Sequence, residues 1–213
     1  MINATSLVES QDLAELFNKY GSDKDCNGYA QLYHTLFDNK RKQAIVMLEI
    51  GIGSLIPGVP SSMVGYALEG YKPGGSLRAW RDYFPAGRII GIDIQSDTQF
   101  SNEPRIETYI TNSTKSMEVE TLMKQLDSPL FDIILDDGSH YDMDQIATLH
   151  NCYSYLKPGG IYIIEDINPG SKLTTLPAII NGLCKQDPYF FVGLKSNICV
   201  IYKSALKTKR LNY

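Results

Sequence analysis

Two acidic groups in the sequence suggest a metal-binding site. They are Asp136-Asp-Gly-Ser-His140 and the pair Glu165-Asp166. If each group ends a strand of one parallel sheet, Asp137 lies beside Glu165 and Asp166, and three carboxylates so close together repel one another. A divalent cation removes that repulsion, and all-oxygen ligation suits Mg²⁺, Mn²⁺ or Ca²⁺ better than Zn²⁺. We therefore predict that Asp137, Glu165 and Asp166 bind a divalent metal ion.

His140 is the candidate general base. It follows Asp137 by three residues, within reach of anything bound to the metal ion. An imidazole, whose unperturbed pKa is about 6.5, suits proton transfer at neutral pH. The alternative is that the acids cap a helix and that His140 is an ordinary surface histidine, but capping alone does not explain acids after two strands. His34 and His150 fall within helical patterns, and we expect them to be structural.

A second group has the types and spacing of a nucleoside site. Glu49-Ile-Gly-Ile-Gly53 lies at the end of one predicted strand, and Asp93 ends the next. Glycines there let a ligand approach the backbone, and a carboxylate after the second strand can accept both hydroxyls of a ribose. The third glycine of G-x-G-x-x-G is missing, so a tight turn without a ligand and a capping role for Asp93 remain alternatives. We favour ligand binding because the two features occur together.

The elements that must position these residues follow from short apolar runs. Runs rich in β-branched residues predict strands that are buried on both faces, as in parallel sheets. The expected strands are 44–50, 88–94, 106–110, 131–135 and 160–165, and the helices between them are 76–84, 116–126 and 142–156. This alternation indicates βαβ units.

The C-terminal part is expected to differ. A helix near 175–185 precedes two strands, 189–194 and 198–203, that are close enough to form an antiparallel hairpin. Two helices are expected before the first strand, one starting at a capping box at Ser6 and one over 29–37. We therefore predict an α/β fold, a doubly wound and mostly parallel seven-stranded sheet with a C-terminal antiparallel hairpin and N-terminal helices.

The length of 213 residues predicts a single domain. We expect residues 1–40 to form a helical cap over the active site, residues 44–203 to form the core and residues 204–213 to form a tail. Residues 54–75 are rich in Gly, Pro and Ser and form an unusually long connection. A loop of this length in a compact domain is usually functional, so we expect a lid or binding loop.

Composition excludes some classes of partner. The net charge of −4 disfavours nucleic acid, and the longest apolar runs are far too short for a membrane span. The four cysteines, Cys26, Cys152, Cys184 and Cys199, are scattered and suggest neither a zinc site nor a disulfide framework. With no signal-peptide pattern at the N-terminus, we expect a cytoplasmic protein with reduced thiols.

Several of these motifs resemble class I S-adenosylmethionine-dependent methyltransferases. The resemblance rests on Glu49-x-Gly-x-Gly53, Gly91-Ile-Asp93, the turn Lys157-Pro-Gly-Gly160 and the closing hairpin. It implies a Rossmann-like fold in which Glu49 contacts the methionine part of S-adenosylmethionine and Asp93 holds the ribose. The cofactor-binding residues that it implies are Glu49, Gly51, Gly53, Ser76, Asp93 and Asp136.

A narrower similarity is to metal-dependent sugar O-methyltransferases, which act on deoxysugars of macrolide and tetracenomycin-type antibiotics. It rests on Tyr20-Gly-Ser-Asp-Lys24, Gly74-Gly-Ser-Leu-Arg78, Tyr83-Phe-Pro85, Asp136-Asp-Gly-Ser-His140 and Glu165-Asp166. It implies that Asp137, Glu165 and Asp166 bind Mg²⁺, with Mn²⁺ or Ca²⁺ as substitutes, and that His140 is the catalytic base. A small-molecule or glycan hydroxyl is then the substrate, and we expect a homo-oligomer that binds neither nucleic acid nor membrane.

Three alternatives remain open. A catechol-type O-methyltransferase acting on an aromatic diol would place similar carboxylates at the same strand ends. A non-catalytic α/β protein with a structural Ca²⁺ would need the carboxylates but no cofactor. A nicotinamide dehydrogenase is disfavoured, because G-x-G-x-x-G is missing and the sheet is expected to end in an antiparallel hairpin.

Overall fold

The structure is a computed structural model, and it describes residues 13–59, 62–127, 129–168, 170, 175–186, 190–195 and 197–205. The chain forms two compact units, Met1–Thr111 and Asn112–Tyr213. The predicted capping box at Ser6 and most of the predicted tail lie outside the described residues. No helix of the described part is both long and apolar enough to cross a membrane.

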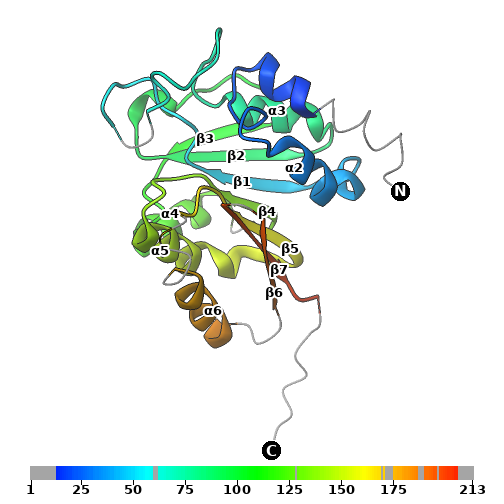
Figure 1. The fold of residues 1–213 in the computed structure, drawn as a ribbon, viewed down its shortest axis with the longest axis vertical. Coiled ribbons are helices and arrows are strands. Elements are labelled where there is room, and N and C mark those ends of the chain that lie inside the picture. The colour runs from blue at the N-terminus through cyan, green and yellow to red at the C-terminus, as the bar shows by residue number, and fades with distance from the viewer. Residues whose placement is uncertain are drawn as a thin grey trace, which may run out of the picture. The chain divides into compact units, whose positions relative to one another are not determined.

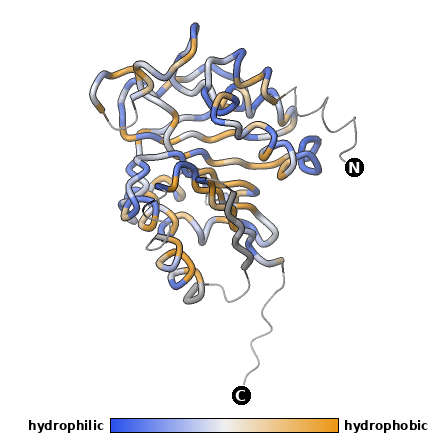
Figure 2. Tube along the Cα trace, viewed as in Figure 1, coloured by the Kyte–Doolittle hydropathy of each residue, from blue (hydrophilic) through white to orange (hydrophobic). Residues whose placement is uncertain are grey.

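The first unit contains three parallel strands. β1 (Val46–Ile50) pairs with β2 (Arg88–Asp93), and β2 pairs with β3 (Ile106–Ile110) (Figure 1). β1 and β2 are mostly apolar (Figure 2) and almost wholly buried, whereas β3 alternates between buried and partly exposed residues. The pairing register places Glu49 opposite Gly91, so both predicted nucleoside-binding acids lie at or near the carboxyl ends of neighbouring strands.

An aromatic cluster joins the N-terminal helices to α3 (Gly75–Tyr83), which packs on β2 and β3. The Trp80 ring on α3 is fully buried, with the rings of Phe17 at 4.9 Å and Tyr33 at 5.3 Å, both edge to face. Phe17 belongs to the helical residues 13–19, and Tyr33 belongs to α2. The remaining helical bounds of this unit are α2 Ala30–Phe37, η1 Asp38–Lys40 and η2 Ser96–Thr98. Trp80 is therefore a core residue of this unit.

The long connection between β1 and α3 is bonded to the glycine turn that follows β1. The Tyr71 hydroxyl lies 3.1 Å from the carbonyl oxygen of Ile52 and 3.0 Å from that of Gly53, and it donates to this pair. At the start of the connection, the Asp97 carboxylate accepts from the Ser54 hydroxyl and from the Leu55 backbone N–H, both at 2.7 Å. These bonds give residues 54–75 fixed attachments within the first unit, and their predicted role as a lid stays a prediction.

Gly53→Ala should destabilise the first unit more than an alanine at a comparable glycine does. Gly53 has φ +76°, and an added Cβ would clash with the Tyr71 hydroxyl. The left-handed backbone costs a side chain about 1–2 kcal/mol, and overpacking adds about 1–3 kcal/mol. Gly58→Ala is the matched control, because its φ is +78° and nothing lies within 4 Å of its added Cβ. Urea unfolding measures both, and equal losses would contradict the role of Tyr71.

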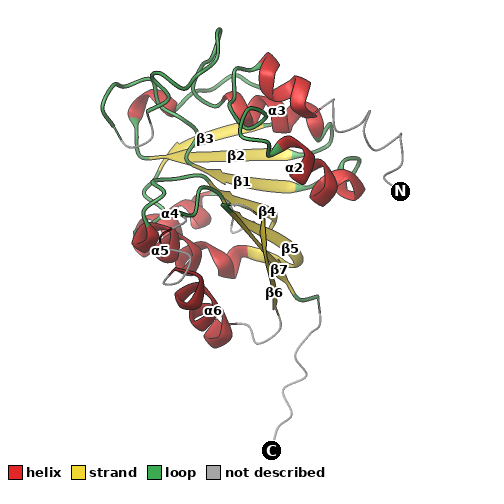
Figure 3. Ribbon diagram, in the orientation of Figure 1, coloured by secondary structure: helices red, strands yellow, loops and turns green. Residues whose placement is uncertain are grey.

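The second unit contains a mixed sheet covered by helices that contact one another in sequence, α4 with α5 and α5 with α6 (Figure 3). β4 runs parallel to β5, whereas β7 is antiparallel to β5 and to β6. The strands are β4 Phe131–Asp136, β5 Leu156–Ile164, β6 Phe190–Lys195 and β7 Ile198–Lys203; the helices are α4 Ser116–Gln125, α5 Asp142–Cys152, η3 Tyr153–Tyr155 and α6 Thr175–Gln186. The predicted closing hairpin is confirmed.

Two predicted boundaries are wrong between α5 and β5. The helix expected over 142–156 ends at Cys152. The Lys157-Pro-Gly-Gly160 segment was expected to be a turn before a strand at 160–165, but β5 already begins at Leu156. The pairing shifts register there, because Phe131 faces Leu156 whereas Ile133 faces Ile161. Gly159 has φ +79°, which lets the backbone loop out while the strand keeps its partner. The described residues contain seven strands, three in the first unit and four in the second; that all seven form one sheet stays a prediction.

Candidate active site

The candidate metal-binding residues follow two neighbouring parallel strands of the second unit. Asp136, the last residue of β4, pairs with Ile164, the last residue of β5. The Glu165 N–H continues this pattern and donates to the Asp136 carbonyl oxygen at 2.9 Å. Asp137 and Asp166 therefore leave the same edge of the sheet, as the sequence predicts.

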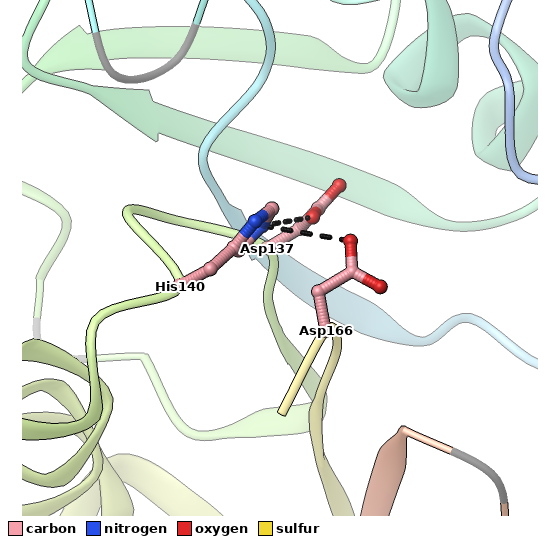
Figure 4. Close-up of side chains that lie close together, drawn as sticks. All are labelled: Asp137, His140 and Asp166. Atoms are coloured by element: carbon pink, nitrogen blue, oxygen red, sulfur yellow. Dashed lines mark hydrogen bonds and ion pairs between the residues drawn. The ribbon is translucent and has the colours of Figure 1, made fainter. Parts of the chain in front are cut away.

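Three side chains converge at this edge. The His140 Nε2 atom lies 3.0 Å from Asp137 Oδ1 and 3.8 Å from Asp166 Oδ2 (Figure 4). One ligand atom from each residue fits within a group 4.8 Å across, which is close enough to hold a metal ion. All three side chains are partly exposed, so a ligand can reach them. The sequence predicts that acids from separate strands lie together beside an imidazole, and Asp137, Asp166 and His140 are arranged in this way.

Two of the three residues have strained backbone conformations. His140 has φ 60° and Asp166 has φ 53°, both in the left-handed region that residues other than glycine seldom adopt. The Asn197 side-chain amide, at the turn between β6 and β7, donates to Asp166 Oδ1, and the Asn197 carbonyl oxygen accepts from the Ile167 N–H at 2.8 Å. The hairpin therefore fixes the strained segment that carries Asp166.

Glu165 lies differently from the other predicted ligands. Its side chain is buried, and it does not belong to the group of ligand atoms formed by Asp137, His140 and Asp166. Its carbonyl oxygen accepts from the Gln145 side-chain amide at 2.9 Å, which ties this strand end to α5. The role of Glu165 as a metal ligand stays a prediction.

The neighbouring carboxylates control the charge of His140. Partial burial lowers the pKa of the imidazole, but the hydrogen bond to Asp137 and the charges of Asp137, Asp166 and Glu165 outweigh it and raise the pKa to about 9. With the protein groups alone, His140 is therefore protonated at pH 7 and supplies positive charge between two acids. A protonated ring cannot accept a proton, so a base role requires these negative charges to be neutralised.

We expect His140 to release a proton when a divalent cation binds. A cation on Asp137 and Asp166 offsets the charges that raise the pKa, which then falls from about 9 toward its ordinary 6.5. An NMR titration of the ring in EDTA-treated protein, repeated with Mg²⁺, measures both values. In EDTA the interaction stabilises the folded state below about pH 6.5, and this contribution is lost as the pH rises through about 9. A pKa that Mg²⁺ leaves unchanged would show that the cation binds elsewhere.

Asp136 is buried beneath this edge. Burial, together with the charge of Asp137, raises the pKa of its carboxyl to about 7, although the Gly138 N–H, which donates to its Oδ1 at 3.3 Å, opposes the shift. That hydrogen bond shapes the turn leading to His140. The predicted contact between Asp136 and a cofactor stays a prediction.

The predicted cofactor residues Glu49 and Asp93 lie in the first unit, where both acids are buried. The Asp93 carboxylate accepts from the Ile52 N–H within the glycine turn and from the Gln95 N–H, both at 3.0 Å. Asp93 thereby joins the end of β2 to the turn after β1. Glu49 forms a buried ion pair with Lys24, whose Nζ lies 3.5 Å from Glu49 Oε1.

The other predicted cofactor residues in this unit adopt conformations that suit a tight turn. Gly51 and Gly53 have φ 78° and 76°, and the Gly51 N–H donates to the Ile92 carbonyl oxygen at 2.9 Å. Ser76 is buried near the start of α3. The side of Gly53 where a Cβ would stand is filled by Tyr71 and Met63, so packing within the protein already accounts for this glycine.

Sequence reasoning missed several residues that shape the site. Asn197 orients Asp166, Gln145 holds Glu165, Tyr71 braces the glycine turn, and Lys24 pairs with Glu49. Each is distant in sequence from its partner, so no local spacing marks it. Only Lys24 could have been singled out from the sequence, because it ends Tyr20-Gly-Ser-Asp-Lys24, one of the motifs that carry the family resemblance.

Curated relatives of the chain are sugar O-methyltransferases. It is 33% identical over 156 residues to 8-demethyl-8-alpha-L-rhamnosyl tetracenomycin-C 2'-O-methyltransferase of Streptomyces olivaceus and 32% identical over 162 residues to mycinamicin VI 2''-O-methyltransferase of Micromonospora griseorubida. Each match covers 73% of this chain but 37% and 36% of the respective relative. The chain thus spans little more than a third of the length of these relatives. No protein-family model matches the sequence.

Solved structures of the methyltransferase MycE of the mycinamycin biosynthetic pathway, in complex with Mg and SAH (S-adenosylhomocysteine), have the same fold. One crystal form gives a TM-score of 0.73 at 24% identity and covers 95% of this chain and 57% of that chain. A second crystal form gives a TM-score of 0.70 at 26% identity and covers 91% of this chain and 53% of that chain. The predicted Rossmann-like α/β class and the resemblance to sugar O-methyltransferases are therefore confirmed.

Proposed function

We propose that this chain is an O-methyltransferase that uses S-adenosylmethionine and a divalent cation, chiefly Mg²⁺, to methylate a hydroxyl group of a sugar or glycosylated natural product. The observation that carries the proposal is the convergence of Asp137, Asp166 and His140 within 4.8 Å. Two carboxylates and a basic ring at one strand edge are the groups that a metal-assisted proton abstraction needs.

The donor set suits a hard divalent cation. Asp137 and Asp166 supply carboxylate oxygens, and the arrangement already tolerates a positive group, because the protein groups favour protonated His140. A cation held there would act as a Lewis acid and orient the acceptor hydroxyl. Glu165, the residue before Asp166, is the proposed third ligand of the cation.

His140 would take the proton of the acceptor hydroxyl. Its Nε2 atom is engaged by Asp137 Oδ1, which orients the ring and leaves Nδ1 as the accepting nitrogen. Bound S-adenosylmethionine would supply the methyl group: a C–O bond would form as the C–S bond of the sulfonium broke, S-adenosylhomocysteine would leave, and the hydroxyl proton would go to His140. The chain's contribution is to hold the oxygen in line with the methyl carbon and to accept the proton.

The first unit supplies five of the six proposed cofactor residues. Glu49 would face the methionine part and Asp93 the ribose, with Gly51 and Gly53 allowing close approach and Ser76 nearby on α3. Asp136, which lies in the second unit, stays a predicted cofactor residue. Support comes from the buried acids at the ends of β1 and β2 and from the relatives, which are O-methyltransferases of a rhamnosyl tetracenomycin and of mycinamicin VI. A homo-oligomer and a cytoplasmic location, expected from the sequence, stay predictions.

Calorimetry and turnover together test the proposal. S-adenosylhomocysteine should bind with measurable heat, and Mg²⁺ should be required for methyl transfer to a rhamnosylated acceptor but not for cofactor binding. A catechol acceptor, assayed in parallel, separates the sugar enzyme from the catechol-type alternative. Absence of any heat with S-adenosylhomocysteine, together with Mg²⁺ or Ca²⁺ binding, would favour the non-catalytic cation-binding protein instead.

A further inference from the structure

Lys24 is a buried lysine outside the predicted site residues. Its side chain is 2% exposed, its partner Glu49 is fully buried, and 3.5 Å separates Nζ from Oε1. Burying a charged group costs free energy unless an opposite charge accompanies it, so each member of this pair makes the burial of the other tolerable. The pair is therefore a specific arrangement at the end of β1, not an incidental surface contact.

The chain fixes the segment that carries Lys24. Asp82 and Arg81 both lie on α3. The Tyr20 hydroxyl donates to Asp82 Oδ2 at 2.6 Å and accepts from Arg81 Nη2 at 3.1 Å. Gly21 has φ +72°, and a Cβ there would lie 2.9 Å from the Tyr71 Cα, so this turn packs directly on the long connection. The residues just before Lys24 are thus attached to α3 and to the long connection.

Glu49 lies where a cofactor's amino-acid end would bind under the proposed function. It precedes the Gly51–Gly53 turn by two residues, and ligands of open α/β sheets bind at this edge. An ionised carboxylate makes hydrogen bonds to an ammonium group that are roughly twice as strong as neutral ones. A nearby cation keeps Glu49 ionised without competing as a rigid hydrogen-bond partner, because 3.5 Å is a loose contact.

We propose that Lys24 is a positioning residue that keeps Glu49 ionised and oriented toward the α-ammonium group of S-adenosylmethionine. The proposal rests on the proposed function and adds to it a partner for Glu49. The cofactor's amino-acid end is a zwitterion and the Lys24–Glu49 pair is also neutral, so the two can meet without leaving a net buried charge. Lys24 acts through Glu49, so its removal should weaken recognition of the amino-acid end and leave recognition of the nucleoside end intact.

Two ligands separate these ends. S-adenosylhomocysteine carries the amino-acid group, whereas 5′-methylthioadenosine lacks it and keeps the nucleoside and sulfur. In Lys24→Met, we expect the calorimetric Kd of S-adenosylhomocysteine to rise about 10- to 100-fold, the loss expected for a charged hydrogen bond. The Kd of 5′-methylthioadenosine should stay within about twofold, and Lys24→Arg should recover part of the affinity. Lys42→Met, which removes an exposed lysine of the same unit, is the matched control.

Each other outcome overturns the inference. Equal losses for both ligands would show that Lys24 serves the fold alone, and unchanged affinity for S-adenosylhomocysteine would show that it does not act on Glu49. If Lys24→Met does not fold, Glu49→Gln is compared with the double variant Lys24→Met, Glu49→Gln; a further loss in the double variant would contradict action through Glu49. Wild-type protein that binds neither ligand would instead contradict the proposed function itself.

Discussion

His140→Ala should lower the rate of methyl transfer by about 10²–10⁴-fold while cofactor and metal binding persist. The ring is bonded to Asp137 Oδ1 at 3.0 Å and lies 3.8 Å from Asp166 Oδ2, so it is held beside the proposed metal ligands. Its removal takes away the proton acceptor but neither carboxylate. Single-turnover rates, measured with calorimetric Kd values for S-adenosylhomocysteine and Mg²⁺, separate loss of chemistry from loss of binding.

His150→Ala provides the control for removing an imidazole. His150 is an exposed residue of α5 that was predicted to be structural, so its variant should keep the wild-type rate. Wild-type turnover in His140→Ala would remove the base assignment. A parallel loss of Mg²⁺ affinity would instead place His140 among the metal ligands.

Asp137→Asn should abolish cation-dependent methyl transfer, with a loss of about 10³-fold or more, because Lewis-acid stabilisation amounts to several kcal/mol. The amide keeps the size of the side chain but removes the charge, so the fold is disturbed little. EDTA treatment of the wild-type protein should produce the same residual rate. Mg²⁺ titration of the rate, with and without the substitution, measures the effect.

Asp142→Asn is the matched control for losing one acid nearby. Asp142 starts α5 and lies outside the group formed by Asp137, His140 and Asp166, so its variant should retain Mg²⁺ dependence. Full activity of the wild-type protein in metal-free buffer would end the case for a cation. A residual rate in Asp137→Asn that still responds to Mg²⁺ would show that Asp166 and Glu165 hold the ion without it.

Much of the fold is predictable from sequence because apolar runs mark buried strands. β3 was expected over 106–110 and β7 over 198–203, and both have these bounds in the structure. The start of β5 was missed because Pro158 and Gly159 signal a turn, and a strand that loops out locally shows the same residue types. Backbone pairing with β4 determines where β5 begins, and the residues close to Pro158 in the sequence do not reveal that pairing.

The site was predictable where topology alone determines proximity. Asp137 and Asp166 meet because parallel strands end at one edge, and the sequence shows both strand ends. Glu165 could not be separated from Asp166 in this way, since which of two adjacent residues faces the site depends on backbone angles such as the φ of 53° at Asp166. The Lys24–Glu49 pair depends on tertiary packing between distant segments, for which the sequence offers no spacing rule.

The left-handed backbone conformations of His140 and Asp166 create a conflict between stability and activity. A residue that tolerates the conformation better would stabilise the fold but would remove a side chain that the proposed reaction needs. Glycine adopts such angles more readily than histidine or aspartate do, because it has no Cβ. A library randomised at these two codons and sorted for thermal tolerance alone should therefore accumulate inactive glycine clones. Natural retention of the costlier amino acids would then record the advantage of the reaction rather than that of the scaffold.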